Sequence, residues 1–157
     1  LKEAFAGESQ ANRKYLAFAK KAEEEGYKQV AKLFRAAAEA ETVHAHNHLR
    51  ELKGIKNTKE NLESAISGES YEFLTMYPAM ISDAQAEGNK SAERSFHIAN
   101  EVEKIHHSLY KKALEELGKN KETDYYICKV CGYTAEDGAP DTCPVCGAKK
   151  VAFYKVD

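Results

Sequence analysis

The same charged pattern occurs twice in this chain, and its spacing constrains the fold more than any other feature. Residues 39–44 read E-A-E-T-V-H, and residues 101–106, 62 positions later, read E-V-E-K-I-H. Both copies lie in long Ala-, Glu- and Lys-rich segments without proline, which favours helices. Residues three apart share a helix face, so Glu41 points with His44 and Glu103 with His106. The pattern predicts two helices that each present a carboxylate and an imidazole on one side.

The repeat extends along the chain, so we expect two similar helical hairpins. At the same offset Gly26 corresponds to Gly88 and Tyr15 to Tyr77. A glycine follows each predicted helix, as is typical of helix ends. The expected helices cover residues 1–26, 27–53, 59–87 and 90–117.

Two boundary signals refine the middle of the helical part. Gly54 is expected to stop the second helix, and Thr58 is the expected N-cap of the third. Pro78 lies inside the third helix, where its missing N–H should bend the helix or break its hydrogen-bond ladder locally.

The other helix of each hairpin brings carboxylates to the same height as the repeated motif. Glu41 and Glu103 each lie 15 residues after a glycine turn, roughly 22 Å along a helix. Glu8 lies 18 residues before the first turn, and Glu72, on one face with Glu69, lies 16 before the second. Four helices that present carboxylates and two Glu-x-x-His steps are typical of a two-metal site in a four-helix bundle.

Five carboxylates with two imidazoles suit iron or manganese, and divalent ions would offset the cost of burying several carboxylates together. The alternative is that these are ordinary surface glutamates, since Glu-x-x-His arises by chance in helices. Two copies at matched height disfavour that alternative. Tyr15 and Tyr77 could hydrogen-bond the ligand carboxylates or could simply be core tyrosines, and both interpretations stay open.

The character of the chain changes after a polar linker, residues 119–124. All four cysteines lie in two C-x-x-C loops, and a glycine follows the second cysteine of each loop. Such a glycine permits the positive φ that turns backbone N–H groups towards sulfur. The spacing predicts a tetrahedral four-sulfur site, built by Cys128, Cys131, Cys143 and Cys146. A structural zinc ribbon and a redox iron both fit this donor set.

Composition narrows the function classes. A net charge of −2 gives no electrostatic case for nucleic acid, and no apolar run approaches the roughly 18–20 residues that span a bilayer. The clustered cysteines are interpreted as metal ligands and not as disulfides, which fits a reducing compartment. The expected location is therefore the cytoplasm.

On these residues, nearly the whole chain resembles the rubrerythrin family. The resemblance implies a ferritin-like four-helix domain over 1–118, the linker 119–124 and a rubredoxin-like domain over 125–157. The positions that match the family's di-iron ligands are Glu8, Glu41, His44, Glu69, Glu72, Glu103 and His106, with Tyr15 and Tyr77 at the positions of its neighbouring tyrosines and the four cysteines at its rubredoxin-like knuckles.

The resemblance further implies an activity and its partners. The family's two non-haem irons reduce hydrogen peroxide to water and so protect against oxidative stress. Electrons come from NAD(P)H through a donor such as rubredoxin or its reductase, and the single iron of the four-cysteine site relays them. Zinc is a possible substitute in either site. In the family, one iron exchanges a glutamate for a histidine with oxidation state, and here that pair would be Glu72 and His44.

The connection between the two hairpins limits how one chain can build this site. A ferritin-like site needs its second and third helices parallel, so their connection must return roughly 35–40 Å. Residues 54–57 reach less than about 20 Å even when fully extended. We therefore expect a domain-swapped homodimer, or a tetramer built from it, in which hairpins of two chains share each site.

Two other function classes compete with the peroxidase. The first is a ferroxidase or iron-storage protein, which has no use for a one-electron relay. The second is a zinc-ribbon interaction protein with an incidental helical bundle, which visible absorption separates because ferric tetrathiolate is coloured and zinc is silent.

Overall fold

The structure is a computed structural model that describes all of residues 1–157. The chain divides into two compact units, residues 1–56 and 57–157. Each unit contains one of the two hairpins that the internal repeat predicts, and the second also contains the four cysteines.

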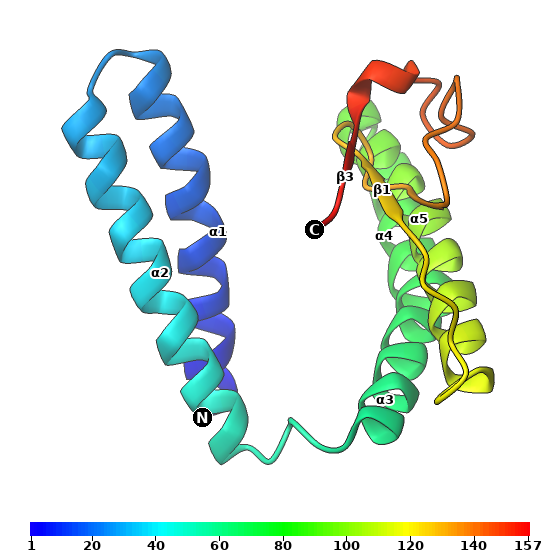
Figure 1. The fold of residues 1–157 in the computed structure, drawn as a ribbon. Coiled ribbons are helices and arrows are strands. Elements are labelled where there is room, and N and C mark those ends of the chain that lie inside the picture. Colours follow the sequence, from blue (N-terminus) through cyan, green and yellow to red (C-terminus); the bar gives the residue numbers. More distant parts are fainter. The chain divides into compact units, whose positions relative to one another are not determined.

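The first unit is an antiparallel pair of helices, α1 (Lys2–Glu24) and α2 (Lys28–Glu51) (Figure 1). The tight turn between them depends on Gly26, which has φ +86°. Small side chains let the two backbones approach closely. The fully buried residues of this unit are all alanines, at positions 19, 22, 31, 38 and 45.

The second unit begins with a helix that changes its winding. The helix α3 (Thr58–Tyr71) continues into a π-helical turn, η1 (Glu72–Met76), and then into α4 (Tyr77–Ala86). Pro78 lies directly after the π turn and cannot donate a backbone hydrogen bond. The expected local break of the ladder at this proline is confirmed. The antiparallel partner of α3 and α4 is α5 (Lys90–Glu115).

The two hairpins repeat each other in detail. The turn at Gly88 has φ +70°, and the Asn89 N–H donates to Ala84 O at 2.8 Å, as the Tyr27 N–H donates to Ala22 O in the first turn. The Tyr15–Phe34 ring centroids lie 6.1 Å apart, and the corresponding Tyr77–Phe96 centroids 6.3 Å apart. The repeat in sequence is therefore a repeat in structure.

A small antiparallel sheet forms the C-terminal part of the second unit. Its strands are β1 (Tyr125–Cys128), β2 (Thr134–Glu136) and β3 (Phe153–Lys155), in the order β2-β1-β3. The short helix η2 (Lys150–Ala152) leads into β3. The Lys129 N–H donates to Ala152 O at 2.9 Å and holds the first cysteine loop against this end of the sheet.

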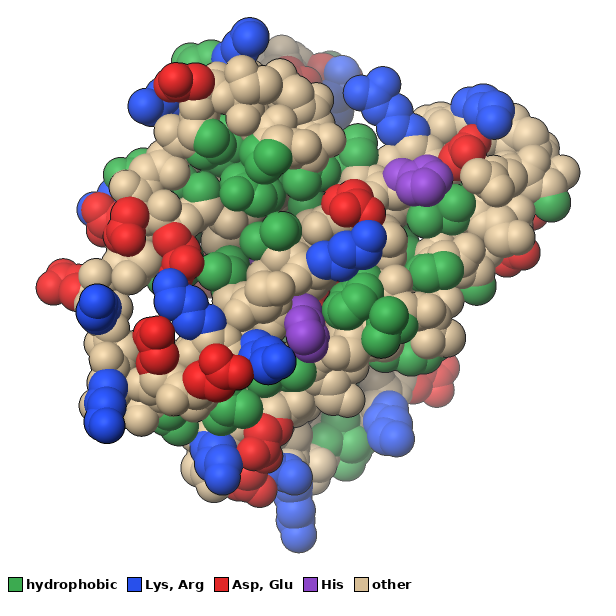
Figure 2. Space-filling model, turned by 90° about the vertical axis from the view of Figure 1, so that its right-hand side faces the viewer, with side chains coloured by type: hydrophobic (Ala, Val, Ile, Leu, Met, Phe, Trp, Pro, Cys, Tyr) green, Lys and Arg blue, Asp and Glu red, His purple; other side chains and the backbone are tan.

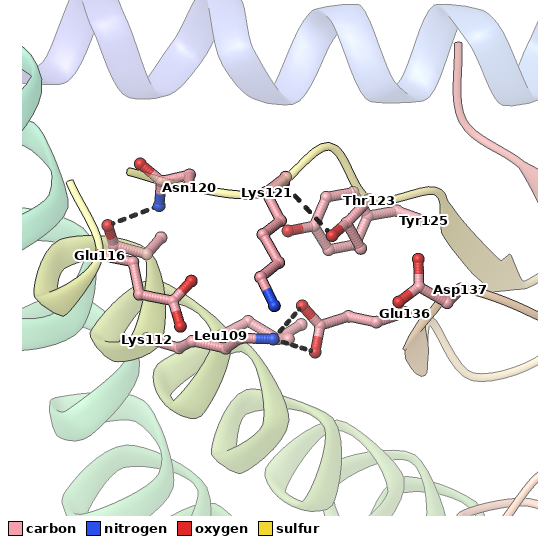
Figure 3. A pocket seen from close by; sticks show the side chains of 10 residues that line it. Leu109, Lys112, Glu116, Asn120, Lys121, Thr123, Tyr125, Glu136 and Asp137 are labelled. Atoms are coloured by element: carbon pink, nitrogen blue, oxygen red, sulfur yellow. Dashed lines mark hydrogen bonds and ion pairs between the residues drawn. The ribbon is translucent and has the colours of Figure 1, made fainter. Parts of the chain in front are cut away.

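The segment that joins α5 to the sheet is fixed to the helix by polar contacts (Figure 3). Asn120 Nδ2 donates to the Ala113 carbonyl at 3.0 Å. Lys112 Nζ donates to both carboxylate oxygens of Glu136, on β2, at 2.9 and 3.0 Å. Both ends of the connection are held, so the sheet is mounted on the helix that carries the second Glu-x-x-His step.

Two predicted helix boundaries are wrong in their residues. The N-cap of α3 is Asn57, not Thr58: Asn57 Oδ1 accepts from the Glu60 N–H at 3.0 Å, and Thr58 is the first helical residue. At the end of α2 the left-handed residue is Lys53, with φ +53°, one position before Gly54. The Gly54 N–H then donates to Leu49 O at 3.0 Å.

Both hairpins leave large apolar side chains uncovered. Leu33 and Val43 of the first unit are 67% and 56% exposed, and Tyr71 and Leu74 of the second are 59% and 67% exposed. On the face drawn in Figure 2, acidic and basic side chains are interspersed, with hydrophobic side chains between them. None of the helices combines the length and the apolar character that crossing a bilayer requires.

The cap at α3 gives a test of this assignment. Replacing Asn57 with Ala removes the acceptor for the Glu60 N–H, and a lost N-cap typically costs about 1 kcal/mol. We expect Asn57→Ala to lower the urea-derived free energy of unfolding by about that amount. Thr58→Ala is the matched control and should change it little; an equal loss in both variants would contradict the assignment.

Candidate metal centres

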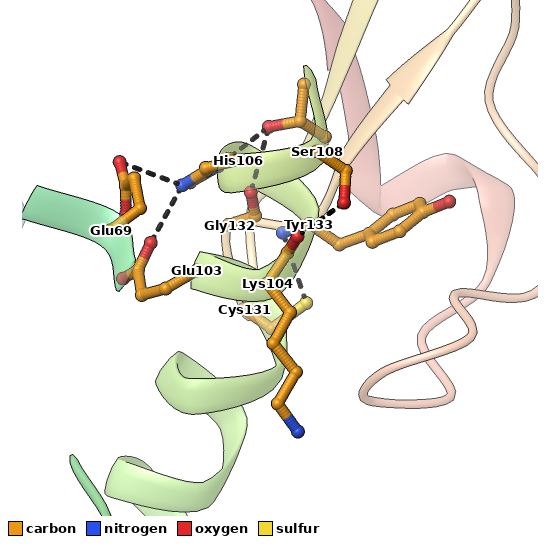
Figure 4. Close-up of polar contacts among 9 residues, drawn as sticks. Glu69, Glu103, Lys104, His106, Ser108, Cys131, Gly132 and Tyr133 are labelled. Carbon is orange, nitrogen blue, oxygen red and sulfur yellow. Dashed lines mark hydrogen bonds and ion pairs between the residues drawn. The ribbon is translucent and has the colours of Figure 1, made fainter. Parts of the chain in front are cut away.

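The second unit gathers two carboxylates and one imidazole at one place, which we call the second cluster. It consists of Glu69 from α3 with Glu103 and His106 from α5, and their donor atoms lie within 4.8 Å of one another. His106 Nδ1 lies 2.8 Å from Glu103 Oε2 and 3.9 Å from Glu69 Oε1. Figure 4 shows both carboxylates directed at the same side of the ring. The predicted Glu-x-x-His geometry is thus formed.

Burial and the neighbouring carboxylates both shift the pKa values of the glutamates at the second cluster. Burial raises the pKa of Glu69 to about 7. The hydrogen bond with Glu103 and the negative charge of Glu103 also raise this pKa. Burial also raises the pKa of Glu72, as does the charge of Glu103. Glu69 Oε2 is buried and has no hydrogen-bond partner. Such a group costs free energy unless a cation or donor meets it.

Tyr77 belongs to the surroundings of this cluster. Burial raises the pKa of its hydroxyl, and the charges of Glu103, Glu72 and Glu69 raise it further. Its phenol therefore remains a proton donor beside the carboxylates. The π turn separates Glu72 from Tyr77, and π turns inside helices occur frequently at functional sites.

The first unit holds the corresponding first cluster, formed by Glu8 from α1 with Glu41 and His44 from α2. His44 Nδ1 lies 2.9 Å from Glu41 Oε2, which repeats the contact in the second cluster. A hydrogen bond with Glu41 raises the pKa of Glu8, and hydrogen bonds with Glu8 and His44 lower the pKa of Glu41. The two carboxyl groups therefore titrate as a coupled pair, with Glu8 the more readily protonated of the two.

Asn12 fixes the first cluster by linking its two helices. Asn12 Nδ2 donates to the Ala38 carbonyl at 2.8 Å and to Thr42 Oγ1 at 2.9 Å. Asn12 lies one turn after Glu8, and Thr42 directly follows Glu41, so this contact sets the height of α1 against α2. The equal heights predicted from residue counts are thus formed within this unit.

The four cysteine sulfurs form one group of donors. Cys128 Sγ lies 3.7 Å from Cys146 Sγ, and Cys131 Sγ lies 3.5 Å from Cys143 Sγ. Sulfurs at the corners of a tetrahedron around an ion at about 2.3 Å would be roughly 3.8 Å apart. A disulfide would need about 2.05 Å. The arrangement fits one thiolate-bound ion.

The glycines of both cysteine loops take the predicted conformation. Gly132 has φ +83° and Gly147 has φ +76°. Their N–H groups donate to the Cys128 and Cys143 carbonyls at 2.8 and 2.9 Å. The Tyr133 N–H donates to Cys131 Sγ at 3.4 Å, a backbone contact of the kind that a thiolate needs.

Of the predicted residues, Tyr15 is the one that the geometry does not bring to a carboxylate. Its ring packs against Phe18 and Phe34, and its hydroxyl has no hydrogen-bond partner.

Two residues near the second cluster were not predicted. Tyr110 has its pKa raised by burial and by Glu69 and Glu103, and Thr134 contacts His106. Tyr110 follows His106 by one helical turn, so the sequence contained a signal that it lies near the cluster. No nearby sequence pattern indicated Thr134.

The donor sets of both kinds of site fit metal ions. Each cluster offers two carboxylates and an imidazole, the ligands that iron accepts, and the buried Glu69 Oε2, which has no hydrogen-bond partner, is suited to a cation. The second kind of site is formed by the four cysteines, whose sulfurs have the spacing of tetrahedral ligands. Together the helical hairpins and the small sheet define a class: a helical carboxylate–histidine metalloprotein with a tetrathiolate module.

Comparison with known proteins agrees with this class. The family model described as rubrerythrin matches residues 1–114, and the model for the rubredoxin-like domain of rubrerythrin matches residues 126–154. The chain belongs to the rubrerythrin family. It is ferritin-like in its helices and rubredoxin-like in its C-terminal module, and its cofactors are those of the family, a di-iron centre and a single ion held by four cysteines.

Individual relatives cover nearly all of the chain. Rubrerythrin-2 of Clostridium acetobutylicum is 39% identical over 98% of this chain and 92% of the relative. Nigerythrin of Nitratidesulfovibrio vulgaris is 36% identical over 98% and 83%. A solved structure of nigerythrin in a partially reduced state superposes with a TM-score of 0.64, at 35% identity over 99% of this chain and 84% of that one.

The raised pKa of Glu69 predicts how the stability of the metal-free protein depends on pH. Between pH 4.5 and about 7 the folded state keeps a proton on Glu69 that the unfolded state has lost. The free energy of unfolding should therefore fall as pH rises through this window. Glu69→Gln should flatten that slope when urea unfolding is followed from pH 4.5 to 8.

The matched control is Glu63→Gln on the same helix, since Glu63 is exposed and forms only a loose ion pair with Lys59 at 3.9 Å. Its slope should equal that of the wild-type protein. A Glu69→Gln protein with an unchanged slope would show that burial does not hold the proton on Glu69.

Proposed function

We propose that this protein is a di-iron peroxidase that reduces hydrogen peroxide to water and protects against oxidative stress. The observation that carries the proposal is the pair of matched Glu–His clusters in a chain that also carries a tetrathiolate site. A solved relative is titled as nigerythrin in its fully reduced, all-ferrous state, at 35% identity and a TM-score of 0.63. Iron redox chemistry in that protein supports the same metal here.

We assign the di-iron ligands to Glu8, Glu41, His44, Glu69, Glu72, Glu103 and His106. Glu41 and Glu103, the repeat equivalents, would bridge the ions. The bound irons supply two electrons and Lewis acidity for O–O cleavage. The four cysteines would hold a single iron, which would supply one-electron redox chemistry; zinc in its place would hold the loops but supply no electrons.

The protein's own groups bind the substrate and provide protons. Reduction of one hydrogen peroxide to two waters consumes two electrons and two protons. Glu69 would bind the metal through its ionised carboxylate, and the proton that it keeps up to a pKa of about 7 without metal would leave as the metal binds. The Tyr77 hydroxyl stays protonated beside it and can donate a hydrogen bond to a peroxide oxygen. Tyr15 would do the same from the first hairpin.

Electrons would reach the cysteine site from NAD(P)H through a donor such as rubredoxin or its reductase. Metal-bound cysteines in place of disulfides favour the cytoplasm as the location. We infer three functional parts: residues 1–118 hold the di-iron centre, 119–124 connect, and 125–157 carry the electron relay.

We also propose that two chains complete each di-iron site in a domain-swapped dimer. Each hairpin holds three ligands of one cluster and leaves large apolar side chains uncovered, which supports packing against another hairpin. The connection between α2 and α3, residues 52–57, is too short to return along a bundle. The first hairpin of one chain would then pair with the second hairpin of its partner.

The activity predicts different effects for two glutamates in the same motif. Glu103→Ala removes a bridging ligand, so steady-state peroxide consumption should fall at least about 100-fold, beyond the 10–100-fold range of residues that only support ligands. Glu101→Ala is the control, since Glu101 is exposed and pairs with Lys104. Equal activity in both variants would contradict the proposal. A large iron-storing cage without peroxide turnover would favour the ferroxidase alternative.

The swapped dimer predicts complementation between two inactive variants. A heterodimer of Glu41→Ala and Glu103→Ala chains would contain one site with both defects and one site with none. Purified heterodimer, selected with two affinity tags, should therefore show about half of the wild-type peroxide consumption. If each chain builds its own site, every site carries one defect, and the heterodimer stays inactive.

A further inference from the structure

The small sheet lies along α5 in a defined register. Gly132 lies against Val102, since a Cβ on Gly132 would meet Val102 Cγ1 at 3.8 Å. Two residues on, Thr134 Oγ1 lies 3.1 Å from His106 Nε2. The next contact, Lys112 with Glu136, follows in the same order.

The hydroxyl of Thr134 lies between His106 and the cysteine loop. Thr134 Oγ1 is 3.3 Å from the Gly132 carbonyl, to which it can donate its hydrogen, and 3.1 Å from His106 Nε2. When Nδ1 of His106 binds a metal, Nε2 carries the ring proton and can donate it to Thr134 Oγ1. Nδ1 faces Glu103 and Glu69 (Figure 4). A ring nitrogen that faces two carboxylates is in the position of a metal ligand.

The contact connects the two metal sites of the same chain. Gly132 directly follows Cys131, and the N–H of Tyr133 donates to Cys131 Sγ. Small metal-bound loops take their shape from the ion that they hold. The position of Thr134 therefore depends on the cysteine loop, and the orientation of His106 depends on Thr134. His44, the repeat equivalent, is 53% exposed against 29% for His106, and Glu41 is its only hydrogen-bond partner.

We propose that Thr134 is a positioning residue that couples the two metal sites of one chain. Its hydroxyl holds His106 with Nδ1 turned to the carboxylates while the four-cysteine site is loaded. Loading of the cysteine site thus raises the metal affinity of the second cluster, and by linkage the reverse also holds. The inference rests on the proposed function only in taking the second cluster as a metal site.

The test measures binding rather than turnover. The full-length protein receives one Zn²⁺ per chain, which thiolates take in preference, and is titrated with Mn²⁺, which prefers carboxylates. Free Mn²⁺ is read from its EPR signal. Thr134→Val, which keeps the shape and removes the hydroxyl, should weaken Mn²⁺ binding about 10–100-fold. Thr134→Ser should bind like the wild-type protein, as should Thr142→Val, an exposed threonine of the same module.

The ring proton and the coupling give two further readouts. Side-chain ¹⁵N spectra of the protein with zinc in all sites, assigned with His106→Gln, should show a proton on Nε2 of His106 and a metal on Nδ1. Emptying the cysteine site should weaken Mn²⁺ binding by the wild-type protein about tenfold and leave Thr134→Val unchanged.

Several results would overturn the coupling. They are Mn²⁺ binding by Thr134→Val equal to that of the wild-type protein, a proton on Nδ1 of zinc-bound His106, or equal affinity with the cysteine site loaded and empty. If Thr134→Val does not fold, Thr134→Ala takes its place, with the Co²⁺–thiolate absorption of its cysteine site reporting a folded loop. Absence of peroxide turnover alone would refute the peroxidase and leave this inference standing.

Discussion

Carboxylates that are held close together and partly out of water repel one another unless a cation lies between them, and the rest of this structure depends on that constraint. Glu69 keeps its proton to a pKa of about 7 and has a buried oxygen without a partner. In the other hairpin a hydrogen bond between Glu8 and Glu41 raises the pKa of Glu8 and lowers that of Glu41. A protein does not keep such arrangements for stability, since their repulsion opposes folding. The arrangement favours a folded state that contains metal.

The helices provide the rigidity that this arrangement needs. Asn12 fixes the height of α1 against α2, and the π turn before Pro78 separates Glu72 from Tyr77. Alanines bring the helix backbones together, and little large apolar surface is buried inside either hairpin. Each hairpin therefore has little stabilisation of its own from buried apolar side chains. The module on α5 distinguishes the second half of the repeat, because Thr134 contacts His106.

The sequence predicts the carboxylate and cysteine clusters well because their geometry is local. A Glu-x-x-His step fixes Glu41 beside His44 whatever surrounds it, and a C-x-x-C loop fixes Cys128 beside Cys131. Counting residues from the turn at Gly26 then placed Glu8 at the height of Glu41 along the hairpin. The cap at Asn57 was missed because Asn and Thr are both good caps and differ here by one position.

Contacts that depend on tertiary structure could not be read from the chain. Thr134 lies 28 residues from His106, and its role depends on how the sheet is mounted on α5. The Lys112–Glu136 contact that helps to mount it is 24 residues apart in sequence. For Tyr15 the sequence left two interpretations open, a neighbour of the ligands or a core tyrosine, and its ring packs against Phe18 and Phe34.

The most direct test of the account is anomalous X-ray diffraction from iron-loaded crystals, recorded on both sides of the iron absorption edge. The account predicts two iron atoms about 3.5–4 Å apart with Glu41 and Glu103 each touching both, and a third iron among the four sulfurs. Iron in the cysteine site alone, with Glu41 and Glu103 in contact only with water, would contradict it.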